Sequence, residues 1–177
     1  MRCTGVLVAR LAAGESTAYT EAYHQLRPRL FGFLLRLCRN RAVAEELLQD
    51  AFVKLALNAS KLRPDTELSA WMFTVARNVA MSYRRWAALD ASRILLWATR
   101  QRSLLTPEEE AASTEGERKL EQAMAKLAYT DREVLLLVGV EALSPQHAAE
   151  VLGINDATLR QRLSRARQRL AAALEPS

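Results

Sequence analysis

Residues 154–170 read INDATLRQRLSRARQRL, and within this stretch five arginines occur but no acidic residue follows Asp156. Leu159, Leu163, Ala166 and Leu170 recur at intervals of four, three and four residues, which predicts the apolar face of one helix. Polar and basic side chains occupy the rest of its circumference. So many cations opposite an apolar face are typical of a helix that binds a polyanion.

The residues before this helix match the pattern of a helix-turn-helix motif. Ser144 and Pro145 are favoured at a helix start, and Gly153 suits the left-handed residue that ends a short helix. Asn155 or Asp156 then caps the longer helix. The second helix of such a motif enters the major groove of DNA. The alternative interpretation is a solvated basic helix that only packs on its neighbours.

The composition favours helices over strands throughout the 177 residues. Half of the residues are hydrophobic, whereas only six are Gly and five are Pro. The net charge is +5, but residues 106–117 contain five Glu and no Lys or Arg. We therefore predict an all-α protein with two small helical domains joined by a flexible acidic linker. The predicted parts are an extension (1–17), a first domain (18–100), the linker (101–117) and a helix-turn-helix domain (118–177).

Apolar spacing places the individual helices within these domains. It predicts helices over about 18–39, 42–58, 70–88, 118–128, 131–140, 145–152 and 156–173. Pro28 suggests a kink or an offset first turn in the first of them. Residues 59–68 contain Arg63-Pro64-Asp65 and are predicted to form a loop, with Ser69 as the cap of the next helix.

The sequence contains no pattern expected of a metal site or a catalytic site. Cys3 and Cys38 are too few for a disulfide framework or a zinc site, and His24 and His147 lie in separate domains. No P-loop or catalytic triad is present, so we expect no cofactor, no small-molecule substrate and no enzyme activity. The N-terminal apolar run is short and interrupted by Arg10, which argues against export. A cytoplasmic protein is expected.

Two parts of the chain together resemble one protein family. AEELLQDAFVKLALN (44–58), followed by LSAWMFTVARNVAMSYRR (68–85), resembles the core-binding and promoter-melting region of bacterial RNA polymerase sigma factors. The segment LAYTDREVLLLVGVEALSPQHAAEVLGINDATLRQRLSRARQRL (127–170) resembles their C-terminal region. The layout is similar to the extracytoplasmic-function (ECF) group of the sigma-70 family, over about residues 18–88 and 118–171.

The resemblance implies a role for each part of the first domain. The polar face with Glu46, Gln49 and Asp50 is expected to meet the clamp helices of the largest polymerase subunit; by itself it would be interpreted as a solvated acidic face. The loop 61–68 corresponds to the family's loop that holds a flipped base of the −10 element. The candidates for −10 DNA binding are Lys61, Arg63, Arg77, Asn78, Tyr83, Arg84 and Arg85. Trp71 and Phe73 are expected to be core residues.

In the second domain, the resemblance implies that the basic helix recognises the −35 element. The candidates are Thr158, Arg160, Gln161, Arg162, Ser164 and Arg165, although the sequence does not separate base contacts from phosphate contacts. Residues 94–105, with Trp97, are expected either to pack on one of the domains or to extend toward the polymerase active-site channel.

The predicted function is that of a sigma factor, which binds core polymerase, recognises the −35 and −10 elements and promotes melting. Its expected partners are the largest and β subunits of core polymerase, promoter DNA and an anti-sigma factor, which in this group is commonly membrane-linked. One alternative is a stand-alone helix-turn-helix regulator whose first domain senses or dimerises. The other is a helical adaptor that uses residues 18–88 for protein contacts only.

Overall fold

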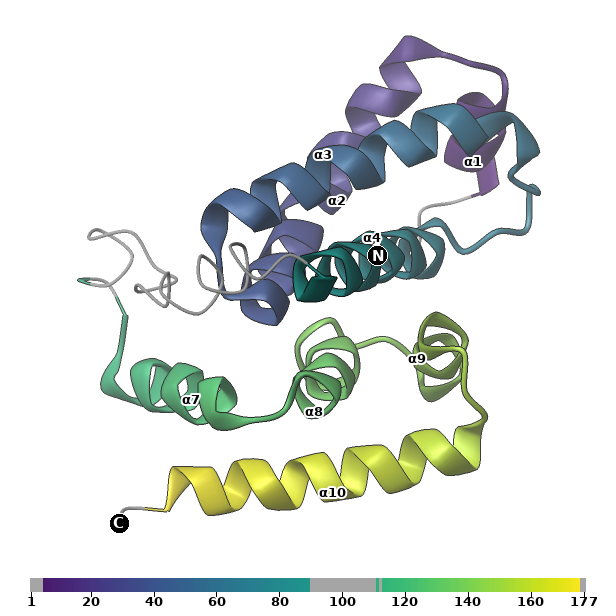
Figure 1. Cartoon of the computed structure of the whole chain (residues 1–177). Coiled ribbons are helices and arrows are strands. Elements are labelled where there is room, and N and C mark those ends of the chain that lie inside the picture. Colours follow the sequence, from purple (N-terminus) through teal and green to yellow (C-terminus); the bar gives the residue numbers. More distant parts are fainter. Residues whose placement is uncertain (1–4, 90–110, 112, 176–177) are drawn as a thin grey trace. The chain divides into compact units, whose positions relative to one another are not determined.

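The computed structural model describes residues 5–89, 111 and 113–175, and within these ranges every regular element is a helix (Figure 1). The chain divides into two compact units, Met1–Arg100 and Gln101–Ser177. These findings confirm the prediction of an all-α protein with two helical domains. The predicted linker, 101–117, lies largely outside the described residues, as does the stretch 94–105.

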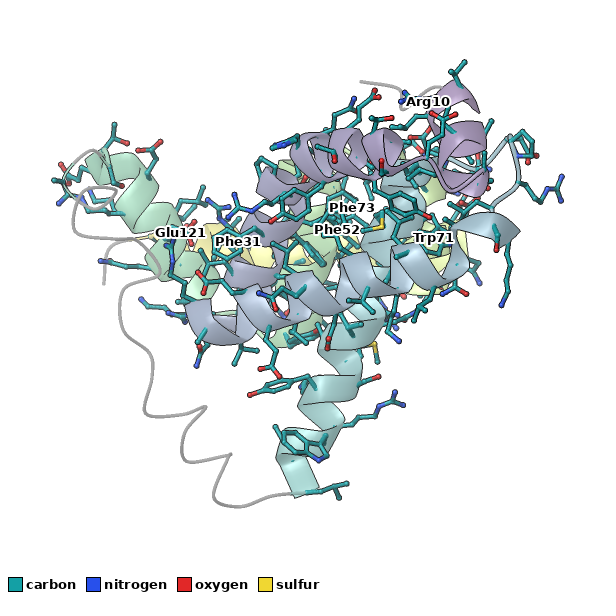
Figure 2. All side chains as sticks on the ribbon, turned by 90° about the horizontal axis from the view of Figure 1, so that it is seen from above. Arg10, Phe31, Phe52, Trp71, Phe73 and Glu121 are labelled. Atoms are coloured by element: carbon teal, nitrogen blue, oxygen red, sulfur yellow. The ribbon has the colours of Figure 1, made fainter. Side chains whose placement is uncertain are left out.

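The first unit contains four α-helices and one short 3-10 turn among its described residues. They are α1 (Gly5–Ala12), α2 (Ser16–Cys38), α3 (Arg41–Asn58), η1 (Ala59–Lys61) and α4 (Leu68–Leu89). Helices α2, α3 and α4 pack against one another. The rings of Phe33 on α2 and Phe73 on α4 meet edge to face with their centroids 5.4 Å apart, and both side chains are fully buried. Figure 2 shows Phe73 inside this unit.

Part of the predicted N-terminal extension forms helix α1. Leu7, Val8 and Leu11 are buried, and α1 contacts both α2 and η1. Figure 1 shows α1 beside the turn that links α3 to α4. Burial of three aliphatic side chains contributes to the stability of a short helix that would not persist alone in water.

The structure corrects one predicted cap. Ser69 does not cap α4, because the helix already begins at Leu68 and the amide of Trp71 donates to the carbonyl of Glu67 at 3.0 Å. Ser69 is buried, and its hydroxyl accepts a hydrogen bond from Nη1 of Arg29 at 3.3 Å. Tertiary contact with α2 therefore determines the role of this serine. Helix α2 continues through Pro28.

The second unit contains α7 (Glu115–Lys126), α8 (Tyr129–Leu135), the π-helical turn η2 (Leu136–Val140), α9 (Pro145–Leu152) and α10 (Asp156–Leu174). Helix α7 begins with a capping box, in which Thr114 accepts from the amide of Glu117 while the carboxylate of Glu117 accepts from the amide of Thr114. Helix α10 packs on α7, α8 and α9. None of the described helices combines the length and the apolarity that crossing a membrane requires.

Helices α9 and α10 form the predicted helix-turn-helix. The hydroxyl of Ser144 accepts from the amide of His147 at 3.2 Å, and Pro145 occupies the first turn of α9. Gly153 ends α9 with φ 65°, a left-handed conformation in which a residue with a Cβ would be strained. The Asn155 side chain then caps α10 by accepting from the amide of Thr158 at 2.8 Å. Local sequence signals therefore set this turn.

Candidate nucleic-acid and protein interfaces

The outer face of α10 presents the predicted −35 residues. Leu159 and Ala166 are buried, and Leu163 and Leu170 are half-buried, so the predicted apolar stripe faces the unit. The side chains of four candidates are exposed, namely Arg160, Gln161, Ser164 and Arg165. Thr158 and Arg162 are half-buried and lie at the margins of this face. An exposed row of guanidinium, amide and hydroxyl groups on one helix can contact base edges and phosphates in a major groove.

One of the five arginines in the opening stretch has an acidic partner. Nη1 of Arg169 lies 2.5 Å from Oδ2 of Asp131, on α8, and the Asp131 side chain is 9% exposed. The sequence contains no acid near Arg169 along the helix, but the fold brings one from 38 residues away. The ion pair therefore links α10 to α8. The Asp131 carboxylate already offsets the charge of Arg169 in the protein without DNA.

The loop between η1 and α4 is closed by its own hydrogen bonds. The amide of Arg63 donates to the hydroxyl of Thr66 at 3.1 Å, and the amide of Thr66 returns a bond to the carbonyl of Arg63 at 2.9 Å. Arg63 also forms two 3.1 Å contacts with the carboxylate of Asp65, although both side chains are largely exposed. Lys61 is exposed. Lys61 and Arg63 are the two −10 candidates on the loop, and the charge of Arg63 lies beside the carboxylate of Asp65.

The remaining −10 candidates lie on α4 in two environments. Asn78, Arg84 and Arg85 are exposed, whereas Arg77 and Tyr83 are half-buried. All five lie on α4 between residues 77 and 85, C-terminal to the core residue Phe73. The predictions for the two aromatic residues differ in outcome, because Phe73 is fully buried as expected but Trp71 is only half-buried.

The predicted polymerase-binding residues share one exposed face of α3. Glu46, Gln49 and Asp50 are exposed, and Val43, Leu47 and Leu55 on other sides of the helix are buried. Helical spacing continues the exposed face to Val53 and Leu57, whose exposed fractions are 56% and 71%. A face that begins with carboxylates and ends with exposed aliphatic side chains is suited to a protein partner.

A groove between α3 and α4 joins residues of the two predicted interfaces. Its volume is about 560 Å³, and its lining includes Glu46 and Asp50 from α3 with Asn78, Tyr83 and Trp86 from α4. Carboxylates assigned to protein binding and polar groups assigned to DNA binding are therefore neighbours. The chain brings them together across about thirty residues of sequence.

Three residues of these surfaces were not predicted from the sequence as interface residues. Trp86 is 46% exposed, lines the groove and has its ring 6.1 Å from the ring of Tyr83. An aromatic residue directly after the Arg84-Arg85 pair was the available signal, since basic and aromatic side chains together favour single-stranded nucleic acid. Val53 and Leu57 were also missed, although they continue the spacing of Glu46 and Asp50.

Structural contacts outside these surfaces perturb the pKa values of Arg10 and Glu117. Hydrogen bonds to the carboxylates of Glu15 and then Glu21 raise the pKa of the Arg10 guanidinium. Hydrogen bonds from the backbone and the hydroxyl of Thr114 lower the pKa of Glu117. Within the described ranges, no cluster of three or more His, Cys, Asp or Glu has the arrangement to hold a metal ion.

Two family models match the chain in separate places. The model described as sigma-70 region 2 matches residues 22–88, and the model described as sigma-70 region 4 matches residues 117–170. The first match contains the α3–α4 groove, and the second contains the helix-turn-helix. The two segments that carry the candidate interfaces are therefore those recognised by the two models.

Several curated proteins are similar to most of the chain. The ECF RNA polymerase sigma factor EcfG of Rhodopseudomonas palustris is 31% identical over 150 residues, which are 83% of this chain and 80% of the relative. The RNA polymerase sigma factor CarQ of Myxococcus xanthus is 30% identical over 91% of both chains. Among solved structures, the sigma factor RpoE of Bartonella quintana, in complex with the anti-sigma factor NepR, matches with a TM-score of 0.73. It is 25% identical, and the match covers 88% of this chain and 96% of that one.

Proposed function

The chain belongs to the ECF group of sigma-70 factors, and we propose that its three exposed faces divide the work of promoter recognition among them. The protein is a promoter-recognising factor for transcription initiation that binds RNA polymerase. The observation that carries the division is the exposure of the candidate residues on three helical elements. These are one face of α3, the loop together with α4, which meets that face at the shared groove, and the outer side of α10.

Helix α10 is assigned to the −35 element. Gln161, Ser164 and Arg165 occupy the part of the helix opposite the buried Leu159 and Ala166, so they are the residues that a major groove would meet first. Arg160 lies beside them and suits a phosphate contact. Arg169 is assigned to the Asp131 ion pair rather than to DNA.

The loop and α4 are assigned to the −10 element. Lys61, Arg84 and Arg85 are exposed cations that suit the phosphates of a separated strand, and Asn78 offers an amide for a base edge. Tyr83 and Trp86 supply aromatic faces on which unpaired bases can stack. Stacking favours the separated strand over the duplex, so binding energy here would promote melting.

The face of α3 from Glu46 to Leu57 is assigned to core polymerase. In this assignment the carboxylates provide charge complementarity, and the exposed Val53 and Leu57 provide apolar area that binding removes from water. The protein itself then makes and breaks no covalent bond, because the polymerase carries out the chemistry. That partner also places the working protein in the cytoplasm.

A protein inhibitor is a further partner in this proposal. The similar RpoE structure was solved with an anti-sigma factor bound. A partner of that class that covers the α3 face would compete directly with polymerase. Prior formation of the inhibitor complex should therefore block binding of core polymerase, and simultaneous binding of both would contradict the assignment.

The test of the proposed function is run-off transcription from a genomic promoter library with bacterial core polymerase. Start sites that appear only with the protein and share −35 and −10 motifs are the expected result. The double variant Glu46→Gln, Asp50→Asn should weaken core binding by about tenfold, or about 1.4 kcal/mol. Glu45→Gln is the neighbouring control, because Glu45 pairs with Arg41 and does not line the groove that contains Glu46 and Asp50.

Two outcomes would overturn this function. Failure to produce new start sites, together with failure to co-elute with core polymerase, would exclude a sigma factor. A dimer that binds a palindromic duplex without polymerase would instead identify a stand-alone regulator.

A further inference from the structure

Helix α1 is held firmly on α2 at its C-terminal end. The guanidinium of Arg10 donates to Glu15 at 2.8 Å, to Glu21 at 2.8 Å and to the hydroxyl of Thr17 at 3.1 Å. The Tyr19 hydroxyl also donates to the carbonyl of Leu11 at 3.3 Å. Figure 2 shows Arg10 at the outer side of the unit, which leaves the buried face of α1 to the aliphatic residues. The helix therefore has a fixed position relative to α2.

The N-terminal end of α1 lies against the backbone of the loop assigned to −10 recognition. A Cβ placed on Gly5 would lie 2.9 Å from the carbonyl oxygen of Pro64. That distance is too short for any real pair of such atoms, and the opposing atom belongs to the backbone rather than to a flexible side chain. Gly5 thus allows an approach between α1 and the loop that no other residue type permits.

Hydrogen bonds within the loop hold it together, so a displacement of one part should shift the whole loop. The amide of Leu62 donates to the carbonyl of Ala59 at 3.1 Å, and reciprocal hydrogen bonds between Arg63 and Thr66 close the following turn. Leu68 is fully buried at the other end. A displacement of Pro64 would therefore change the position of the whole turn relative to α4.

We propose that α1 acts as a strut that fixes the loop 61–68, and that Gly5 is a positioning residue for base recognition in the −10 element. The proposal rests on the proposed function of this loop. Gly5 touches no DNA in this account; it acts through the backbone of Pro64. The Arg10 network holds the opposite end of the strut, so loss of that network should have the same kind of effect.

The experiment uses the full chain with core polymerase and a promoter found in the run-off assay. Transcription is compared between that promoter and versions with single-base substitutions in the −10 element. Gly5→Ala should lower the preference for the correct base by about fivefold or more at one −10 position, since a mismatch ordinarily changes affinity by about five- to a hundredfold. Arg10→Ala, which removes an exposed network and should leave the core intact, should lower it in the same direction.

Two substitutions on α7 serve as controls. Gly116→Ala adds a Cβ that meets nothing within 4 Å, and Lys119→Ala removes an exposed ion pair with Glu115. Both should retain the wild-type base preference. Thermal unfolding by circular dichroism checks that each variant is folded at the assay temperature.

The results separate this inference from the function on which it rests. Wild-type base preference in folded Arg10→Ala or folded Gly5→Ala would overturn the strut, while start sites with the wild-type protein would still support a sigma factor. An equal loss of transcription at every promoter version, without a change of preference, would also overturn it, because it would indicate general destabilisation. Wild-type protein that gives no start sites would overturn both.

Discussion

The surface on α10 belongs to a single helix, whereas the groove in the first unit is shared by α3 and α4. Each exposed candidate on α10 projects from the same rigid element, and its neighbours lie three or four residues away. In the groove, Glu46 and Asp50 face Asn78 and Tyr83 only because the core holds two helices together. Substitutions on α10 should therefore have local effects, while the groove should be sensitive to packing beneath it.

The largest effect is expected from removing the core beneath the groove. Phe73→Ala takes away a fully buried ring that meets Phe33, and should cost about 3–5 kcal/mol of unfolding free energy. Binding to core polymerase should fall with it, but binding of a −35 duplex at low salt should be retained. Urea unfolding and fluorescence anisotropy measure the two quantities. Parallel loss of −35 binding would break the contrast between the two regions.

A smaller effect should separate the two roles proposed for the first unit, polymerase binding and −10 binding. Trp86→Ala should weaken binding of a single-stranded −10 oligonucleotide to the polymerase complex by about 1–3 kcal/mol, because stacking on an aromatic ring contributes that much per base. Affinity for core polymerase should stay unchanged. Val53→Ala, on the outer face of α3, should show the reverse pattern. Equal losses in both assays for both variants would mean that the outer face of α3 and the groove work as one inseparable surface.

On α10, two arginines should differ although they lie on the same helix. Arg165→Ala removes an exposed guanidinium and should weaken −35 binding by about 1–3 kcal/mol if it contacts a base, with no change in stability. Arg169→Ala leaves the buried Asp131 without its ion pair and should lower the melting temperature of the second unit. Thermal melts and duplex titrations distinguish them. A destabilised Arg165→Ala would show that packing matters on the outer face too.

The smallest effect concerns the capping box of α7, far from either binding surface in sequence. Thr114→Ala removes the cap and should cost about 1 kcal/mol at pH 7. The pKa of Glu117 is lowered in the folded state. The stabilisation that its carboxylate gives to the fold is therefore present above the ordinary pKa of 4.5, and it is lost as the pH falls through the folded-state pKa. The difference in melting temperature between wild type and Glu117→Gln should therefore shrink between pH 7 and pH 3. An unchanged difference would show that the carboxylate's charge is irrelevant to the cap.

The sequence predicted best what depends on neighbours within about four residues. The caps at Ser144 and Asn155, the glycine turn at Gly153 and the apolar stripe of α10 all follow from local hydrogen bonding and helical spacing. Ser69 was assigned wrongly because a local cap competes with a buried contact to Arg29, which lies 40 residues away. Longer-range pairing overrides a local preference when the fold buries the side chain.

Contacts between residues that are far apart in the sequence cannot be predicted from the spacing of residue types. The partnership of Arg169 with Asp131 joins residues 38 positions apart. The groove needs the relative rotation of α3 and α4, which core packing determines and a one-dimensional pattern does not contain. Trp86 could be predicted only in part. The adjacent Arg84 and Arg85 indicate nucleic-acid binding, but whether the Trp86 ring is exposed depends on how α4 packs on the core.

The anchoring of α10 has a thermodynamic consequence for DNA binding. Leu159 and Ala166 are buried, and Arg169 is paired with Asp131 near the C-terminal end, so the helix is fixed along most of its length before DNA arrives. Binding then requires little ordering of the protein, and it should proceed without the large negative heat-capacity change of coupled folding. The free energy gained at the −35 element would go into affinity and specificity instead of into forming the recognition helix.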